Sequence, residues 1–266
     1  MFGRNKIAAL VAEFLGTGIL TLLVLSVQRS TIGVPFFVAL SAGLTLAVAY
    51  LALGNVSGGQ FNPALTIGLW TTRRIATARM VLYVIVQLLG AFLGYLLYTY
   101  YAKSKLQEIG GDFSWRIFTA EAVGTAIFAL SYAAGLYQNL STGVRAAVTG
   151  IGYTVGIVAA SAAAIGLANP AVALGVRAWV WGSYVLGPVV GAVVAVNLYH
   201  YLFANATEVA LVPVAATSTV TTSSTGEKVQ TTTVVARKPR KAVATKTVAA
   251  RKTTATRKPA AKRTRK

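Results

Sequence analysis

The sequence contains no cysteine, which excludes disulfides, thiolate metal sites and a cysteine nucleophile. Acidic residues are also scarce, with only 6 Asp and Glu beside 25 Lys and Arg, and His200 is the single histidine. These residues supply no Ser-His-Asp set and no cluster of metal-binding side chains, and the sequence has no phosphate-binding loop. We therefore expect a protein that is not an enzyme and that has no catalytic residues, no metal site and no cofactor.

Charged residues make up only 12% of the 266 residues, where about 25% is usual for a soluble domain, and hydrophobic residues make up 55%. This composition predicts a membrane protein. The net charge of +19 is concentrated at one end, because residues 204–266 hold 14 of the 25 basic residues and only two acids, Glu208 and Glu227. The sequence thus divides into an apolar part, residues 1–203, and a basic tail, residues 204–266.

Six apolar segments reach the length of about 20 residues that a membrane-spanning helix needs. They cover approximately residues 7–27, 34–54, 80–101, 117–137, 146–167 and 180–203. The first is too long for the apolar region of a signal peptide, so we interpret it as a retained span. Two shorter apolar segments, about 62–71 and 169–178, can cross only half of the membrane, and such half-helices are tolerated only inside the protein.

The two halves of the apolar part repeat one another. Ala12–Thr17 (AEFLGT) recurs 108 residues later as Ala120–Thr125 (AEAVGT), and Gly59–Leu65 (GQFNPAL) recurs 107 residues later as Gly166–Val172 (GLANPAV). Each copy, about 7–101 and about 117–203, holds three full spans and one half-span, so the second copy must enter the membrane upside down. This is the inverted-repeat plan, and it predicts an all-α membrane protein with six transmembrane helices and two re-entrant half-helices.

Both half-helices begin with Asn-Pro-Ala. Proline suits the first helical position, and the preceding Asn62 or Asn169 suits the N-cap, so Pro63 and Pro170 fix where the half-helices start. Each helix N-terminus carries roughly half a positive charge, and two of them aimed at the middle of the membrane would repel cations and protons. The side-chain NH2 groups of the two asparagines can offer hydrogen bonds to a passing oxygen. The small residues that follow, Ala64 and Ala171, allow the two ends to touch.

Glu13 and Glu121 occupy equivalent places inside spans, where ionisable side chains are costly and therefore mark candidate sites. Glycines at matching places predict close helix packing. These glycines are Gly16, Gly43, Gly90, Gly94, Gly124, Gly150, Gly187 and Gly191.

The paired motifs, together with Ser57–Thr66 and Gly187–Ala192, resemble the major intrinsic protein family, the aquaporins and glycerol facilitators. The resemblance covers residues 1 to about 203. It implies an aquaporin-like fold, two half-helices that meet head to head, a pore in every subunit, a homotetramer, and water and small uncharged solutes as permeants. It also implies that Glu13 and Glu121 support the half-helices by accepting backbone N–H groups.

The sequence departs from this family at the outer filter, where an arginine normally follows the second Asn-Pro-Ala. Here that residue is Val172, and Arg177 lies more than one helical turn further along. Alignment on the motifs places the other filter positions at Ala42, Ile157 and Gly166. A ring of these four residues would be wide and nearly without side-chain donors, which predicts a filter that is not strictly selective for water. Near the first half-helix, Gln60 stands where the family often has a histidine.

The basic tail predicts disorder, because like charge and low hydrophobic content cannot offset the entropy of ordering. Its expected partner is the anionic surface of the lipid bilayer, and nucleic acid is the alternative, although the tail has no aromatic residues to stack on bases. The position of its basic residues predicts a multi-pass protein of the plasma membrane with both termini in the cytoplasm.

Two other functions remain open at this stage. A secondary transporter also uses inverted repeats, but apart from Glu13 and Glu121 the spans offer no coupling site. A structural or scaffolding membrane protein would use the basic tail for binding and would keep only a vestigial pore.

Overall fold

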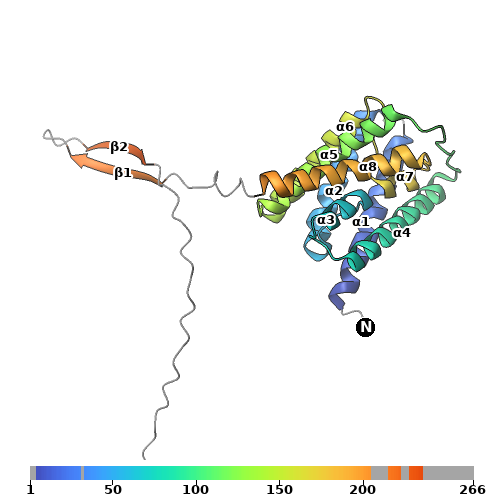
Figure 1. Cartoon of the computed structure of the whole chain (residues 1–266), viewed down its shortest axis with the longest axis horizontal. Coiled ribbons are helices and arrows are strands. Elements are labelled where there is room, and N and C mark those ends of the chain that lie inside the picture. Colours follow the sequence, from blue (N-terminus) through green and yellow to red (C-terminus); the bar gives the residue numbers. More distant parts are fainter. Residues whose placement is uncertain (1–3, 31–32, 205–214, 223–227, 236–266) are drawn as a thin grey trace, which may run out of the picture. The chain divides into compact units, whose positions relative to one another are not determined.

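The computed structural model describes residues 4–30, 33–204, 215–222 and 228–235. The chain divides into two compact units, residues 1–210 and 211–266, which are described separately. The described residues of the first unit form helices joined by loops (Figure 1), with one isolated β-bridge between Ile109 and Ala178.

Six helices of the first unit are long and apolar enough to cross a membrane, as predicted. They are α1 (Arg4–Gln28), α2 (Pro35–Ser57), α4 (Thr77–Ala102), α5 (Trp115–Tyr137), α6 (Thr142–Ala160) and a last span, Gly182–Phe203, in which π-helical turns flank α8 (Gly187–Leu198). Two short helices, α3 (Pro63–Thr71) and α7 (Pro170–Gly175), are the predicted half-helices.

The second repeat differs from the prediction at two helix ends. The fifth span was expected to reach residue 167, but α6 ends at Ala160. The chain cannot stay helical there, because Gly166 and Ala168 have φ angles of 75° and 48°, in the left-handed region. Similarly, α7 ends at Gly175 and not at 178, since Arg177 has a φ of 63°. The non-helical stretch before α7 is therefore longer than the sequence suggested.

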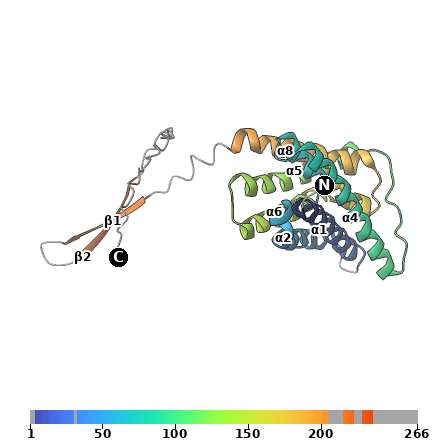
Figure 2. The same ribbon diagram turned by 90° about the horizontal axis from the view of Figure 1, so that it is seen from below.

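The repeat is visible in the packing of the helices (Figures 1 and 2). In the first half, α1 packs against α2 and α4, and in the second half α5 packs against α6 and α8. The two halves join where α2 crosses α6. At that crossing Gly43 and Gly150 face each other, so a Cβ atom on either would collide with the backbone carbonyl oxygen of the other. Glycine is required here because the two backbones are in contact.

Seven of the eight glycines predicted to mediate close helix packing do lie against the backbone of a neighbouring helix. Gly16 is the exception, because the prediction that it packs against another helix was wrong. A Cβ atom on Gly16 would collide with the ring of Phe61, so this glycine makes room for the loop before α3 and not for another helix.

The polarity of the helical unit is inverted relative to a soluble protein. Large apolar side chains such as Val48, Ile151 and Val194 are 58–65% exposed on the outside, whereas Glu13, Glu121 and Gln87 are fully buried. An apolar exterior around a polar interior suits a lipid environment. Exposed aromatic residues near the helix ends, including Tyr101, Trp115 and Tyr201, fit the interface between lipid and water.

The described part of the second unit is a pair of antiparallel strands, β1 (Ala215–Thr222) and β2 (Lys228–Val235), with Ala215 opposite Val235 and Thr222 opposite Lys228. The sequence analysis did not predict these two strands. Both strands are rich in threonine and valine, whose branched side chains favour extended backbone. The rest of the predicted disordered tail, 205–214, 223–227 and 236–266, lies outside the described residues.

Candidate functional site

The two Asn-Pro-Ala segments start α3 and α7 with the same geometry. Asn62 caps α3 through its Oδ1 atom, which accepts hydrogen bonds from the N–H groups of Ala64 (2.9 Å) and Leu65 (3.4 Å). Asn169 caps α7 in the same way, and accepts from Ala171 (3.0 Å) and Val172 (3.4 Å). Each cap satisfies two backbone N–H groups that have no partner within their helix.

The same two asparagines also tie the repeats together. The Nδ2 atom of Asn62 donates to the carbonyl oxygen of Ala168 (2.8 Å), and the Nδ2 atom of Asn169 donates to that of Phe61 (2.9 Å). Phe61 and Ala168 share a left-handed backbone, with φ angles of 47° and 48°. Since an amide NH2 group carries two hydrogens, each asparagine keeps one N–H for another acceptor. These hydrogen bonds link the starts of the two half-helices, and α3 contacts α7.

Glu13 of α1 holds the chain before the first half-helix. Its Oε1 atom accepts from the backbone N–H of Gln60 (3.0 Å), and its Oε2 atom accepts from that of Phe61 (2.7 Å) and from the side chain of Gln87 (2.8 Å). Glu13 is fully buried, and so are these donors, which would otherwise be left without partners.

Glu121 of α5 does the same for the second half-helix. Its two carboxylate oxygens accept from the N–H groups of Gly166 (3.1 Å), Leu167 (3.0 Å) and Ala168 (2.8 Å). In both repeats a buried carboxylate thus replaces the helical hydrogen bonds that the non-helical chain cannot make, which is the role that the resemblance implied.

A buried polar network on the first repeat was missed by the sequence analysis. Gln87 of α4 donates to the hydroxyl of Thr66 (3.0 Å) as well as to Glu13, and Thr66 donates to the Oε1 atom of Gln60 (2.7 Å). The signal was present, because a glutamine in the middle of a span is costly unless it has a partner. This network orients Gln60 and leaves its NH2 group for another acceptor.

Three tyrosines also hold the loops before the half-helices. Their positions in the sequence did not predict this role. The hydroxyl groups of Tyr83, Tyr132 and Tyr153 donate to the carbonyl oxygens of Ser57 (2.8 Å), Gly58 (2.6 Å) and Leu167 (2.8 Å). They come from α4, α5 and α6, so three different helices fix the two loops.

The four outer-filter positions lie on α2, α6, α7 and the loop before α7. Ala42, Ile157 and Val172 are at most 2% exposed and belong to one hydrophobic cluster. Gly166 adjoins Ile157, since a Cβ atom on Gly166 would lie 2.6 Å from the carbonyl oxygen of Ile157. None of the four residues has a polar side-chain atom, so these residues could hydrogen-bond a solute only through their backbone groups.

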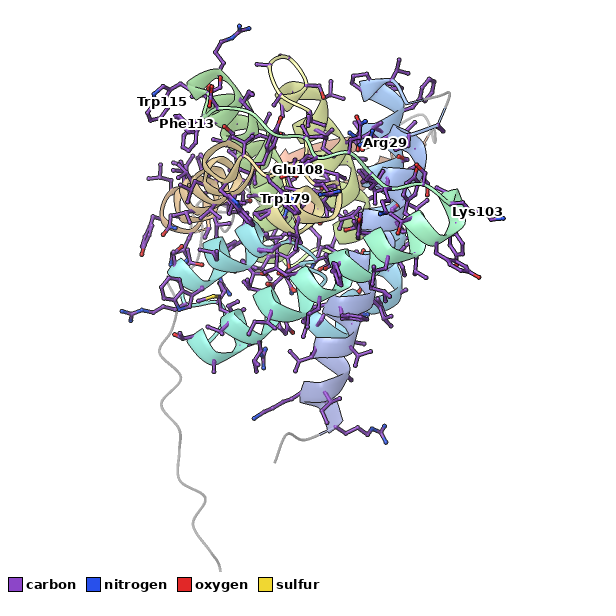
Figure 3. All side chains as sticks on the ribbon, turned by 90° about the vertical axis from the view of Figure 1, so that its right-hand side faces the viewer. Arg29, Lys103, Glu108, Phe113, Trp115 and Trp179 are labelled. Atoms are coloured by element: carbon purple, nitrogen blue, oxygen red, sulfur yellow. The ribbon has the colours of Figure 1, made fainter. Side chains whose placement is uncertain are left out.

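Arg177 does not replace the missing filter arginine, because its guanidinium group is engaged elsewhere. Its Nη1 atom donates to the carbonyl oxygen of Leu106 (2.6 Å), and its Nη2 atom lies 3.5 Å from the Oε2 atom of Glu108. The group also lies over the ring of Trp179. The side chains of Glu108 and Trp179 appear on the face of the helical unit that Figure 3 presents, together with Arg29, Lys103 and Trp115. Arg177 therefore anchors the loop between α4 and α5.

In the described part of the chain, no three His, Asp or Glu side chains come together as metal ligands would. The acidic residues in the site, Glu13 and Glu121, hold different loops.

Comparisons with known proteins agree with this geometry. Residues 3–199 match the model of the family described as "Major intrinsic protein". The chain is 31% identical over 188 residues to Aquaporin AqpM of Methanothermobacter marburgensis, which covers 62% of this chain and 76% of that protein. It is 29% identical over 209 residues to Glycerol uptake facilitator protein-like 6 of Lactiplantibacillus plantarum, covering 70% and 93% of the two chains.

Among solved structures, the fold is similar to that of the aquaglyceroporin from Plasmodium falciparum. The TM-score is 0.64 at 20% sequence identity, and the match covers 77% of this chain and 99% of that one. With six membrane-spanning helices and a matched segment of 197 residues, the chain belongs to the major intrinsic protein family and is a multi-pass membrane channel for water and small solutes, not an enzyme.

Proposed function

We propose that this channel has a wider and less water-selective outer filter than typical aquaporins, and that it passes small neutral solutes such as glycerol as well as water. The observation that carries this proposal is the outer ring of Ala42, Ile157, Gly166 and Val172, which has no polar side-chain atom. Arg177 is committed to Leu106 and Glu108, so it does not narrow the ring. The names of its relatives include both aquaporins and a glycerol facilitator.

Without a filter arginine, rejection of ions rests mainly on the middle of the path. The N-termini of α3 and α7 each present roughly half a positive charge there, which opposes the entry of cations. The remaining N–H of Asn62 and of Asn169 can donate to the oxygen of a passing water. A water held in this way donates no hydrogen bond along the file, which interrupts proton transfer.

The surroundings of the channel follow from charge and from the family. We place it in the plasma membrane as a homotetramer with both termini in the cytoplasm, because residues 204–266 carry 14 of the 25 basic residues. The tail would contact anionic lipid, with nucleic acid as the alternative partner. The competing function is a scaffold that binds through this tail and keeps a vestigial pore.

Stopped-flow measurements on proteoliposomes test the filter. Wild-type protein should pass water and glycerol, and Val172→Arg should lower glycerol permeability about tenfold or more while water still passes. Asn5→Arg is the matched control, because it adds the same charge at an exposed polar position at the start of α1. A wild type that passes water but excludes glycerol would show that the filter is not wide.

Deleting residues 204–266 separates the channel from the scaffold. A channel should keep its permeability, whereas a scaffold should lose its binding to anionic vesicles or nucleic acid and have little permeability to lose. If neither water nor a neutral solute passes through the wild type, the permeant proposal fails.

A further inference from the structure

The repeat assigns a counterpart to each position of the outer filter. With the offset of 107 residues that relates the two Asn-Pro-Ala segments, Ala42 corresponds to Thr149, and Ile157 corresponds to Tyr50. The remaining two counterparts are Gly59 for Gly166 and Leu65 for Val172. Because the repeats are inverted, these counterparts belong to the opposite end of the path, and we call Tyr50, Gly59, Leu65 and Thr149 the inner ring.

The inner ring differs from the outer filter in size and polarity. Tyr50 is the largest residue of the eight positions, and Tyr50 and Thr149 carry hydroxyl groups, whereas the outer filter has no polar side chain. All four inner residues are buried, with Tyr50 2% and Thr149 0% exposed. The large side chain and the hydroxyl groups therefore belong to the inner ring, and the outer filter has neither.

The buried threonines of the helices differ in their hydrogen bonds, and two of them, Thr21 and Thr149, have an unpaired hydroxyl group. Thr17 and Thr125 each donate to the backbone carbonyl oxygen four residues earlier (2.7 Å in both). The hydroxyl of Thr149 is buried but has no hydrogen-bond partner within the protein. Leaving a buried hydroxyl unpaired is costly, so such a group favours a partner that the protein itself does not supply.

The ring of Tyr50 is held firmly over the loop before α3. A Cβ atom on Gly54 or Gly59 would lie 2.8 or 2.6 Å from atoms of this ring, so glycine at both places makes room for it. The ring also meets that of Tyr132 edge to face at 6.2 Å. Tyr132 in turn donates to the carbonyl oxygen of Gly58. These contacts fix the position of Tyr50 on three sides.

Gln60 adds an amide to the same region. A Cβ atom built on Gly58 would lie 3.6 Å from the Nε2 atom of Gln60 and 3.7 Å from the hydroxyl oxygen of Tyr132. Because Thr66 occupies the Oε1 atom of Gln60, its NH2 group is the part that can still donate.

We propose that the inner ring, and not the outer filter, is where this channel selects its solutes. Tyr50 sets the width there, and its hydroxyl, the hydroxyl of Thr149 and the NH2 group of Gln60 exchange hydrogen bonds with the solute. The solutes favoured by such a ring are small neutral molecules that both donate and accept hydrogen bonds, namely polyols and amides such as urea. This inference rests on the proposed permeability to neutral solutes and assigns its selectivity to new residues.

Two substitutions that remove a hydroxyl group with little change in size test the inference, Thr149→Val and Tyr50→Phe. Each should lower the ratio of glycerol to water permeability about two- to tenfold in proteoliposomes, since one hydrogen bond contributes about 0.5–1.5 kcal/mol. Thr119→Val is the matched control, because the hydroxyl of Thr119 is exposed and bonds to the carbonyl oxygen of Trp115. The control should leave the ratio unchanged.

A third variant tests the width. Tyr50→Ala should admit erythritol, a four-carbon polyol, which the wild type should exclude. If this variant does not fold, the glycerol-to-water ratio of Thr149→Val still tests the inference. If the wild type passes glycerol, and Thr149→Val and Tyr50→Phe keep the wild-type ratio of glycerol to water permeability, only the proposed role of the inner ring is wrong. A wild type that passes no neutral solute overturns the proposed function as well, so the two failures are distinguishable.

Discussion

The half-helices α3 and α7 start alike and end differently. Each begins at a proline behind an asparagine cap, and each is preceded by a loop whose N–H groups bond to a buried glutamate. At the far ends the contacts diverge. Trp70 donates to the hydroxyl of Thr77 (3.0 Å) beyond α3, whereas Arg177, at the equivalent place beyond α7, reaches Leu106 and Glu108.

This difference separates the parts of each repeat that contact the other repeat from the parts that do not. The two asparagines bond to each other's loops, so a change at the middle of the membrane disturbs both repeats at once. The far ends of α3 and α7 have different partners, Thr77 for Trp70 and both Leu106 and Glu108 for Arg177. They can therefore diverge without disturbing the junction at the middle of the membrane.

The largest expected effect comes from removing the buried glutamates, Glu121→Leu and Glu13→Leu. Glu121→Leu leaves three backbone N–H groups unpaired, and at about 1–3 kcal/mol each this should cost at least about 3 kcal/mol of unfolding free energy. Glu13→Leu leaves two backbone N–H groups unpaired, and Gln87 keeps its bond to Thr66. Thermal unfolding in detergent should therefore show a larger loss for Glu121→Leu.

Asp112→Leu is the control for this pair, because Asp112 is exposed in the loop after α4. Equal losses for the two glutamate variants would show that the repeats are supported equally. Unfolding temperatures like that of wild type for both would contradict the supporting role itself.

The asparagine caps should give a smaller and more symmetric effect. Asn62→Ala and Asn169→Ala each remove two cap bonds and one bond to the other repeat, so each should cost about 1–3 kcal/mol. The double variant should lose less than the sum of the two, since both changes loosen the same junction. Unfolding in detergent measures this, with the exposed Asn5→Ala as control. Strict additivity would mean that the two loops do not support one another.

The junction of the two halves offers a test of packing. Gly43→Ala and Gly150→Ala place a methyl group against the opposite backbone, and overpacking of this kind costs typically about 1–3 kcal/mol. Gly143→Ala is the control, since a Cβ atom there would meet nothing within 4 Å. A lower unfolding temperature for the control than for Gly43→Ala would contradict the assignment of the α2–α6 crossing as the joint.

The features that the sequence revealed are those whose physical cause is local or periodic. Span lengths, the proline starts of α3 and α7 and the equivalent places of Glu13 and Glu121 follow from composition and repetition. The features that it did not reveal depend on partners far along the chain. Gln87, for example, meets a residue 74 positions earlier, and Tyr132 bonds to a carbonyl oxygen at the same separation.

The structure differs from the sequence predictions in two places where the cause is local. The apolar run after Ala160 looks like a continued span, yet the left-handed Gly166 and the N–H groups taken by Glu121 end the helix early. In the tail, two stretches rich in threonine and valine form β1 and β2. Hydrophobicity decides whether a segment can span, but hydrogen-bond partners decide where it ends.

The smallest predicted effect concerns the end of α7 and belongs to the second repeat alone. Arg177→Met removes the bond to Leu106 and the ion pair with Glu108, and because the two side chains are 25% and 48% exposed the loss should be only about 1 kcal/mol. The amide of Ile109, which donates to the carbonyl oxygen of Arg177, should exchange its hydrogen faster, since the loop between α4 and α5 is then less firmly held.

Hydrogen exchange measured by mass spectrometry follows both repeats in one experiment. Exchange at Gln60 and Phe61 should stay at the wild-type rate in Arg177→Met, because Glu13 still accepts both N–H groups. Lys103→Met, at the exposed end of α4, controls for loss of a positive charge near the same loop. Faster exchange in the first repeat would mean that the far end of one half-helix is coupled to the other, and that the ends of the repeats are not free to diverge.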